Sequence, residues 1–198
     1  MRLEIVEARN PLRPGVEALA RIVYQREYGA DSPCFPDIML AVLDDAGRPH
    51  CVAGFRDHVC GFFSEQYVDD AVEMLIARQT GMAVARESIV ELGPLAADRP
   101  GALLDLLIGF ARIGVGSGYR WGIFTATARL RRLAARLGIP LLELGIADRN
   151  RVAAPGNWGS YYDSDPRVCA VDGLMARQRL LQSRLPCGSG AAQSGVAA

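Results

Sequence analysis

The sequence contains no lysine, and all 22 of its positive charges are arginines, which balance 22 aspartates and glutamates. The absence of lysine excludes an enzyme that works through a lysine nucleophile or Schiff base. Because the formal net charge is zero, no global field draws the chain onto nucleic acid or an anionic membrane. We therefore expect no nucleic-acid partner.

Cysteine is sparse: the five cysteines are widely spaced and form no C-x-x-C pair. This pattern indicates reduced thiols rather than a secreted disulfide framework. The N-terminus carries charges where a signal peptide would place its apolar run. The most apolar stretch, residues 103–115, contains Asp105 and Arg112 and is shorter than the roughly 20 apolar residues of a membrane span. We expect a cytoplasmic protein without integral membrane association.

Histidine is scarcer still, and the two histidines give no metal site. His50 and His58 would stand about 26 Å apart in a single strand at roughly 3.3 Å per residue. His58 and Cys60 share a strand face, but two ligands do not make a zinc site. The sequence therefore predicts no bound metal.

Strand and helix patterns are present along most of the chain. Residues 2–8 alternate polar and apolar, which predicts a half-buried strand. Two apolar runs, 38–43 and 51–55, flank the turn residues 44–47 and predict an antiparallel hairpin. A helical stretch around residues 69–80 follows.

The second half predicts a parallel β-α-β unit, with strands at 88–95 and 120–127 joined by a helix from 99 to about 115. A helix at 128–137 and a strand at 141–147 follow. We therefore predict one α/β domain over residues 1–186, a single mixed sheet with helices on both faces. Residues 187–198 are small and low in complexity and are expected to be a disordered tail.

The first candidate site is the strand that contains Glu91. A carboxylate in a central strand must be paired or hydrogen-bonded, and Pro94 has no N–H for a strand ladder. Gly93-Pro94 therefore predicts a place where neighbouring strands part, so that an extended pantetheine arm could bond the exposed backbone. The alternative is a strand end whose glutamate pairs with an arginine.

The second candidate is the segment 56–67. Glu65 and Gln66 stand among Phe62, Phe63 and Tyr67, an apolar neighbourhood that would raise a carboxylate pKa as a general base requires. Alternatively, this segment is a helix-entry turn whose aromatic rings join the core.

Two further groups follow. Three arginines on one flank of the 128–137 helix could receive phosphates or an acidic partner, or could form a solvated face. They are Arg129, Arg132 and Arg136. Thr125 and Thr127 end the preceding strand and could bond a ligand, although threonine is also an ordinary strand residue.

A glycine-containing loop carries Trp158, Tyr161 and Tyr162. Large aromatic side chains in such a loop can form the wall of a pocket while their polar tips orient a ligand. Alternatively, they cover the open edge of the sheet.

Four blocks, FFSEQYVDDAVE, SIVELGPLAA, GYRWGIFTATARLRRLAARLGIP and NWGSYYDSDPRV, resemble the thermostable hemolysin family in order from about Cys51 to Val171. The resemblance implies the acyltransferase-type α/β fold of GCN5-like N-acetyltransferases and acyl-homoserine-lactone synthases. The antiparallel N-terminal strands would then be followed by a splayed parallel unit. The resemblance also implies that the thioester lies between the two parallel strands, beside Gly93-Pro94 and Thr125.

One stretch departs from the acetyltransferase pattern. Enzymes that use coenzyme A carry a glycine-rich loop whose N–H groups bind the pyrophosphate. Residues 98–102 here have one glycine and a proline without an N–H. An acyl carrier protein that docks on the arginine row therefore stays open as the donor. The residues expected to contact the pantetheine donor are Gly93, Leu95, Ala96, Arg99 and Gly101.

The expected function is acyl transfer from a thioester of coenzyme A or a carrier protein to an amine or similar small nucleophile, with no tightly bound cofactor. Glu65 or Glu91 would act as general base, and backbone N–H groups near Leu95 would support the oxyanion. The acceptor would be bound by Arg56, Gln66, Tyr67, Thr125, Thr127, Trp158, Tyr161 and Tyr162. The alternatives are a membrane-perturbing effector and a noncatalytic binding module on the same fold.

Overall fold

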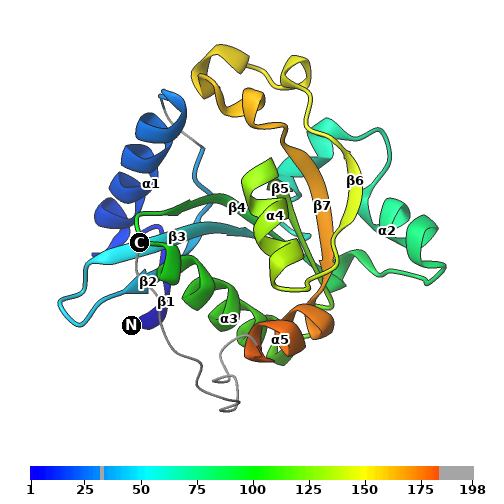
Figure 1. The fold of residues 1–198 in the computed structure, drawn as a ribbon, viewed down its shortest axis with the longest axis horizontal. Coiled ribbons are helices and arrows are strands. Elements are labelled where there is room, and N and C mark those ends of the chain that lie inside the picture. The colour runs from blue at the N-terminus through cyan, green and yellow to red at the C-terminus, as the bar shows by residue number, and fades with distance from the viewer. Residues whose placement is uncertain (32–33, 183–198) are drawn as a thin grey trace, which may run out of the picture.

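The computed structural model describes residues 1–31 and 34–182, whose seven strands form one mixed sheet in the order β1-β2-β3-β4-β5-β7-β6 (Figure 1). The strands are β1 (Arg2–Glu7), β2 (Ile38–Leu43), β3 (Pro49–Arg56), β4 (Ile89–Ala97), β5 (Trp121–Ala126), β6 (Leu142–Ile146) and β7 (Arg167–Asp172). The α-helices are α1 (Arg13–Tyr28), α2 (Val72–Thr80), α3 (Pro100–Gly116), α4 (Ala128–Arg136) and α5 (Gly173–Gln182). The predicted tail lies outside the described residues.

The predicted hairpin is confirmed: β2 and β3 pair antiparallel, and β1 adds to β2 in the same sense. The Asp44 side chain accepts hydrogen bonds from the N–H groups of Ala46 and Arg48, at 3.0 and 2.9 Å. Gly47 adopts a φ of 79°, a conformation that side chains disfavour. The local turn chemistry therefore sets the register of this half of the sheet.

The predicted splayed parallel unit is also confirmed. β4 and β5, joined through α3, pair in parallel only at Ile89–Trp121, Val90–Gly122 and Glu91–Ile123. Beyond Glu91, β4 continues for six residues to Ala97 with its pairing to β3 alone. The wedge opens directly after Glu91, before the ladder reaches Pro94, and the predicted Gly93-Pro94 step, whose peptide bond is cis, lies within it.

A close backbone approach accompanies the opening. The β3–β4 register shifts between Ala53 and Phe55, opposite the Gly93-Pro94 step. A Cβ on Gly54 would lie 2.2 Å from the carbonyl oxygen of Gly93, so only glycine fits at this position.

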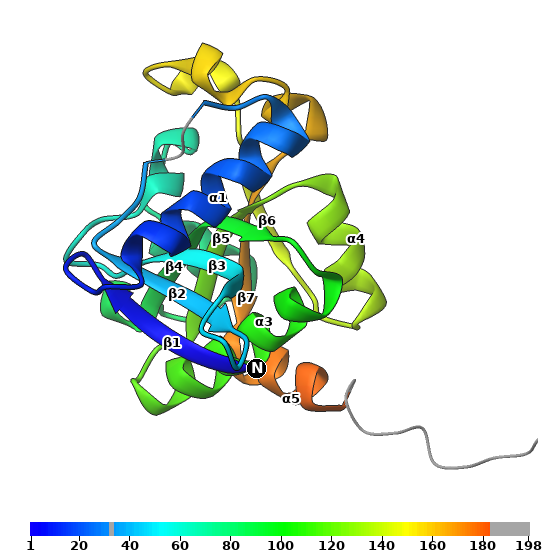
Figure 2. The ribbon, with the colours of Figure 1, turned by 90° about the vertical axis from the view of Figure 1, so that its left-hand side faces the viewer.

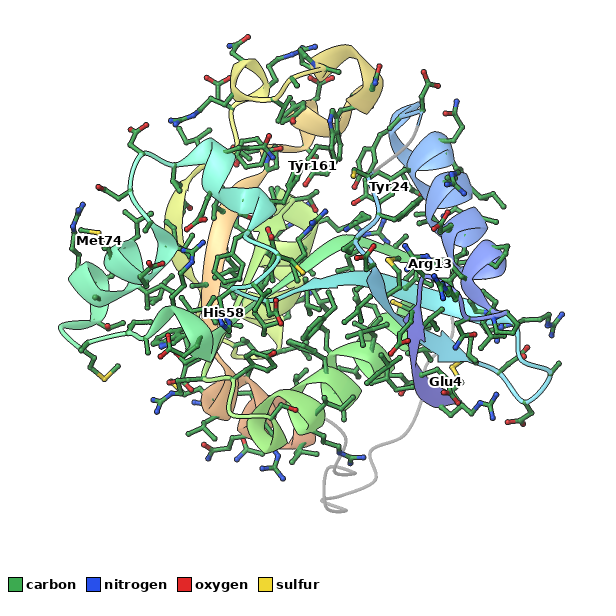
Figure 3. All side chains as sticks on the ribbon, turned by 180° about the vertical axis from the view of Figure 1, so that it is seen from behind. Glu4, Arg13, Tyr24, His58, Met74 and Tyr161 are labelled. Atoms are coloured by element: carbon green, nitrogen blue, oxygen red, sulfur yellow. The ribbon has the colours of Figure 1, made fainter. Side chains whose placement is uncertain are left out.

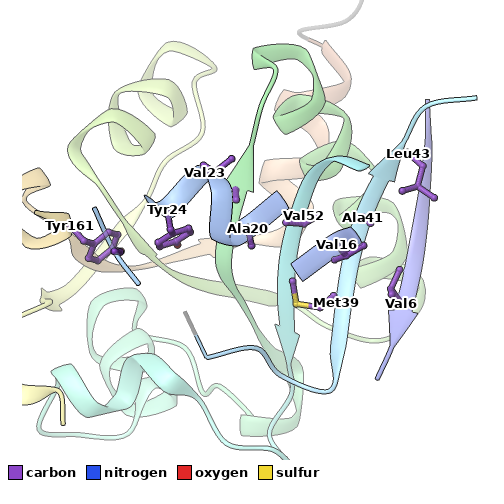
Figure 4. Close-up of a cluster of buried hydrophobic side chains, with 12 residues drawn as sticks. Val6, Val16, Ala20, Val23, Tyr24, Met39, Ala41, Leu43, Val52 and Tyr161 are labelled. Atoms are coloured by element: carbon purple, nitrogen blue, oxygen red, sulfur yellow. The ribbon is translucent and has the colours of Figure 1, made fainter. Parts of the chain in front are cut away.

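Helices cover both faces of the sheet, as predicted. α1, α2 and the short 3-10 helix η1 (Phe63–Tyr67) pack on one face, where α1 buries Val16, Ala20 and Val23 against β1, β2 and β3 (Figure 4). α3, α4 and α5 pack on the other face, and α4 lies in front of β5 and β7 in Figure 1. Figure 2 shows α1 against the antiparallel half of the sheet. Among the described residues, no helix is long and apolar enough to cross a membrane.

The sequence patterns did not predict β7 or α5. β7 lies between β5 and β6 and pairs antiparallel with both. Its apolar run covers only residues 168–171, which is shorter than the runs from which the other strands were predicted. The antiparallel insertion makes the sheet order depend on long-range pairing, which local patterns do not specify.

Candidate active site

A cavity of about 560 Å³ opens where β4 and β5 separate, and its lining comes from both faces of the sheet. On the α1 face the lining is aromatic, from Tyr24, Tyr28, Phe63, Tyr67, Trp158 and Tyr161. On the other face it is mainly aliphatic, from Leu103, Leu107, Ala111, Leu130, Leu133, Ala134, Leu137, Ala176 and Leu180, with Phe110 as an aromatic member. The cavity therefore joins an aromatic compartment to an aliphatic one through the gap in the sheet.

Glu91 lies at the last paired position of β4 and lines this cavity, although only 3% of its surface is exposed. Its carboxylate accepts hydrogen bonds from the N–H of Phe63 at 2.5 Å, the N–H of Ser64 at 2.8 Å and the Ser64 hydroxyl. Burial raises the pKa of Glu91 above its ordinary value, and these hydrogen bonds oppose the rise. A carboxyl group with a raised pKa suits proton transfer near neutral pH.

Arg56 stands directly across from Glu91 in the β3–β4 pair, so the two side chains share a face of the sheet. Its Nε is buried without a hydrogen-bond partner among the described residues. Within that same part of the chain, the guanidinium makes no ion pair within 4.0 Å, although it lines the cavity. A buried donor of this kind costs free energy unless a ligand satisfies it.

The predicted environment of Glu65 is wrong. Arg86 donates to both carboxylate oxygens of Glu65, at 2.6 and 2.7 Å, and to Glu73 at 2.8 Å. These hydrogen bonds lower the pKa of Glu65, against the rise that its aromatic neighbours predicted. Glu65 does not line the cavity, and its carboxylate also accepts from the N–H of Val72 at the start of α2. Its partner is the arginine 21 residues further along, which a local pattern does not reveal.

Ser64 is a residue that the sequence analysis missed. It is completely buried, and besides Glu91 its hydroxyl lies 3.3 Å from Oγ1 of Thr125. Thr125 lines the cavity as predicted. The only signal for Ser64 was its place beside Glu65 within the FFSEQY block.

The aromatic loop packs against α1, and Trp158 and Tyr162 also contact the apolar cluster over β5, β6 and β7. The Ser160 N–H donates to the carbonyl of Tyr28 at 2.8 Å, and a Cβ on Gly159 would lie 2.0 Å from that oxygen. Tyr24 from α1 stacks on Tyr161 with ring centroids 6.2 Å apart (Figure 3). Burial raises the pKa of both phenols, which keeps them protonated. The predicted pocket wall is therefore present, with Tyr24 as an unpredicted member.

The other predicted site residues divide into two groups. Gly93, Leu95, Ala96, Arg99, Thr127, Arg129 and Arg136 line the cavity together with Tyr67, Trp158 and Tyr161. Gln66, Gly101, Arg132 and Tyr162 do not line it. Tyr162 reaches it indirectly, since its hydroxyl lies 2.9 Å from that of Tyr67. Gln66 instead stabilises η1, because its amide donates to the carbonyl of Phe63 at 2.9 Å.

Neither histidine lines the cavity. His50 is buried with Nδ1 at 3.0 Å from Asp98 and Nε2 at 3.2 Å from Asp44. His58 and Cys60 lie exposed after β3. In residues 1–31 and 34–182, no group of three or more histidine, cysteine, aspartate or glutamate side chains could hold a metal ion.

The structure is similar to several solved acyl-transferring synthases. The acyl-homoserine-lactone synthase LasI has a TM-score of 0.58 at 12% identity, covering 87% of this chain and 89% of that one. BjaI, a coenzyme A-dependent acyl-homoserine-lactone synthase solved with S-adenosylmethionine and isopentyl-CoA, has a TM-score of 0.59 at 16% identity. The match covers 99% of this chain and 94% of that one. FeeM, an N-acyl amino acid synthase from uncultured soil microbes, has a TM-score of 0.57 at 11% identity. The match covers 90% of this chain and 99% of that one. No curated protein matches the sequence.

The mixed sheet with its splayed parallel pair therefore has the GCN5-related fold of acyl-homoserine-lactone synthases and N-acyltransferases, as predicted. Within that fold, the model of the thermostable hemolysin family matches residues 6–176. The chain belongs to the thermostable hemolysin family.

Proposed function

We propose that this protein is an acyltransferase that moves a long apolar acyl chain from a pantetheine thioester to the amino group of an amino acid. The observation that carries this proposal is the cavity, which begins at Glu91 in the open wedge and continues into an aliphatic compartment. Fold alone does not fix function, so the proposal depends on the site.

The aliphatic compartment favours a long acyl chain over an acetyl group. Its lining comes from α3, α4 and α5, beyond the gap in the sheet, and is mainly apolar, with Arg129 and Arg136 of α4 as its charged members. Each buried methylene contributes about 0.8 kcal/mol, so an apolar chain gains binding free energy with every carbon that enters. The whole cavity, about 560 Å³, is in the range of sites for drug-sized molecules.

The donor would lie along β4. Leu92 and residues 95–97 pair with β3, and none of residues 92–97 pairs with β5, so a pantetheine arm could bond the free edge of β4 as a pseudo-strand. Arg99, Arg129 and Arg136 at the cavity margin would attract the phosphate of coenzyme A or of an acyl carrier protein. Arg132 lies beside them on α4 and would contact the acidic surface of a docked carrier.

The acceptor would present an amine to Glu91 and a carboxylate to Arg56. Arg56 lacks an ion-pair partner in the described chain, and a carboxylate would satisfy its buried Nε. FeeM, an N-acyl amino acid synthase, and BjaI, solved with S-adenosylmethionine, are consistent with this choice. The aromatic compartment would receive an apolar or aromatic side chain, which makes phenylalanine a suitable test acceptor.

The chemistry follows from these positions. The amine nitrogen attacks the thioester carbonyl and its proton passes to Glu91. The carbon–sulfur bond then breaks to give the amide and a thiolate, which takes the proton back from Glu91 and leaves as the thiol. Backbone N–H groups near Leu95 would stabilise the tetrahedral oxyanion. The raised pKa of Glu91 brings its basicity closer to the working pH.

The test is thiol release by the purified protein with acyl-coenzyme A donors of two to sixteen carbons and phenylalanine or phenethylamine as acceptor. We expect kcat/KM to rise with chain length and phenylalanine to exceed its decarboxylated analogue. Absence of thiol release and of amide product across the series, with both donor types, would refute the proposal. Dye release from liposomes without thioester would instead favour a membrane-perturbing effector.

A further inference from the structure

Glu91 is connected to the open wedge by a chain of hydroxyl groups. The Ser64 hydroxyl bonds Oε1 of Glu91, and its oxygen lies 3.3 Å from Oγ1 of Thr125. The Thr125 hydroxyl makes no other hydrogen bond within the described chain, and Thr125 lines the cavity. Three groups from three different segments therefore form one line from the carboxylate to the cavity.

The position of Thr125 gives this line a direction. The last β4–β5 pair is Glu91 with Ile123, so Thr125 stands two residues further along β5, where the strands have separated. Because side chains alternate along a strand, Ile123 and Thr125 share the face that carries Glu91 and η1. Glu91 thus lies at the closed end of the wedge and Thr125 in its opening.

The carboxylate itself is poorly placed to meet the acceptor first. It is almost fully buried, and both of its oxygens already accept hydrogen bonds from Phe63 or Ser64 on the η1 side. Thr125 is only half-buried and borders the cavity. An amine in the wedge therefore reaches the threonine hydroxyl more readily than the glutamate.

We propose that Thr125 and Ser64 relay the proton of the acceptor amine to Glu91, so that Thr125 is the group that touches the substrate. This inference rests on the proposed acyltransferase function and assigns its proton path.

The relay balances its protons. The neutral amine attacks the thioester carbonyl, and its nitrogen, now ammonium-like, gives a proton to Oγ1 of Thr125. Thr125 gives its own proton to the Ser64 oxygen, and Ser64 gives its own to Oε1 of Glu91. Thr125, Ser64 and Glu91 then each hold the proton that they received from the cavity side. The reverse sequence returns one proton to the departing thiolate, which leaves as the thiol, and restores the resting chain.

The Ser64–Thr125 distance and the pKa of Glu91 are both consistent with proton transfer from Thr125 through Ser64 to Glu91. A separation of 3.3 Å is long for two hydroxyl groups, and such contacts shorten when substrate binds. The Ser64 hydrogen bond also opposes the rise in the pKa of Glu91 that burial causes. Loss of the Ser64 hydroxyl therefore raises the pKa of Glu91 further, which gives the relay a signature in pH.

The experiment measures thiol release with hexadecanoyl-coenzyme A and phenylalanine across pH 5–9 for Thr125→Val, Thr125→Ser, Ser64→Ala and Glu91→Gln. We expect Thr125→Val to lower kcat roughly 10- to 100-fold with little change in the donor KM, and Thr125→Ser to stay within about threefold of the parent. Ser64→Ala should lower kcat similarly and move the acid limb of the pH profile upward.

Matched control variants remove a threonine or a serine hydroxyl at positions outside the cavity lining. Thr80→Val deletes a hydroxyl that bonds the carbonyl of Ile76 in α2, and Ser88→Ala one that bonds the carbonyl of Ala85. Neither residue lines the cavity, so both variants should keep the parental kcat.

Two outcomes would contradict the proposed proton path or its base. Parental kcat and pH profile in Thr125→Val, with Glu91→Gln inactive, would overturn the relay and leave the proposed function standing. Full activity in Glu91→Gln as well would overturn the glutamate as base. If Ser64→Ala does not fold, the Thr125→Val and Thr125→Ser pair still decides, because Ser64 remains in place in both.

Discussion

Two carboxylates at the same short segment, η1, have opposite environments. Glu65 within η1 is held by the Arg86 guanidinium, which lowers its pKa. Glu91 faces the N–H groups at the start of η1 and is buried without an ion pair within 4.0 Å among the described residues, so its pKa is raised. An adjacent cation therefore matters more than apolar neighbours for which glutamate is suited to accept a proton.

The environments of Glu65 and Glu91 are connected through contacts with η1. Arg86 ties Glu65 to Glu73 of α2 and lies over the Phe62 ring, 4.6 Å from its centroid. This network fixes η1, and η1 presents the N–H groups that hold Glu91. Glu65 therefore positions the segment that orients the candidate base.

The largest expected effect separates the two glutamates by activity. Glu91→Gln should lower kcat by roughly 10²- to 10⁴-fold, because it removes the proton acceptor. Glu65→Gln keeps the shape of the side chain and should keep kcat within about tenfold. The measurement is thiol release with hexadecanoyl-coenzyme A and phenylalanine, with a thermal melt of each variant as the folding control.

The pH profile sharpens the same comparison. The carboxyl of Glu91 must be ionised to accept a proton, so activity should fall as pH drops through its pKa, above the ordinary value of 4.5. Glu65→Gln should leave that limb in place. An acid limb that moves in Glu65→Gln and persists in a partly active Glu91→Gln would reverse the assignment of the two residues.

A smaller effect is expected at Arg56, the neighbour of Glu91 across the β3–β4 pair. Arg56→Met should raise KM for phenylalanine roughly 10- to 100-fold, since a hydrogen bond to a charged group contributes about 1.5–3 kcal/mol. KM for phenethylamine, which lacks the carboxylate, should change little. Arg48→Met removes an exposed arginine of the β2–β3 turn and serves as the matched control.

Equal losses for phenylalanine and phenethylamine would contradict this role for Arg56. That result would mean that the guanidinium supports the sheet or the donor rather than the acceptor carboxylate.

Much of the fold could be predicted because its signals are local. The Asp44–Gly47 turn specifies the hairpin, and Gly93-Pro94 marks the wedge that the pairing of β4 and β5 displays. β7 could not be predicted, since only its long-range pairing with β5 and β6 distinguishes it from loop. Sequence patterns thus indicate where pairing stops more readily than which distant strand takes the next place.

The candidate site follows the same rule. Glu91 and Thr125 were predicted from strand position and Arg56 as an acceptor-binding residue of the 56–67 segment, and all three line one cavity. The environment of Glu65 was predicted wrongly because Arg86 lies beyond the local segment. Ser64 was missed because its role depends on contacts with two separate strands.

The smallest expected effect concerns stability rather than activity. Arg86→Met leaves Glu65 and Glu73 without their shared cation and should lower the free energy of unfolding by about 1–2 kcal/mol, between the values for exposed and buried ion pairs. The matched control, Arg78→Met, loses only an exposed pair with Asp70 and should change it by less than about 0.5 kcal/mol. Urea denaturation at neutral pH measures both.

Unfolding at acid pH tests whether the charge of Arg86 causes this stabilisation. Because the pKa of Glu65 is lowered in the folded protein, the ion pair stabilises above the ordinary value of 4.5 and its contribution is lost as pH falls below it. The difference in unfolding free energy between the parent and Arg86→Met should therefore shrink between pH 7 and pH 3. A difference that stays constant would mean that Arg86 acts through its packing on Phe62 rather than its charge, and η1 would then be fixed by apolar contact.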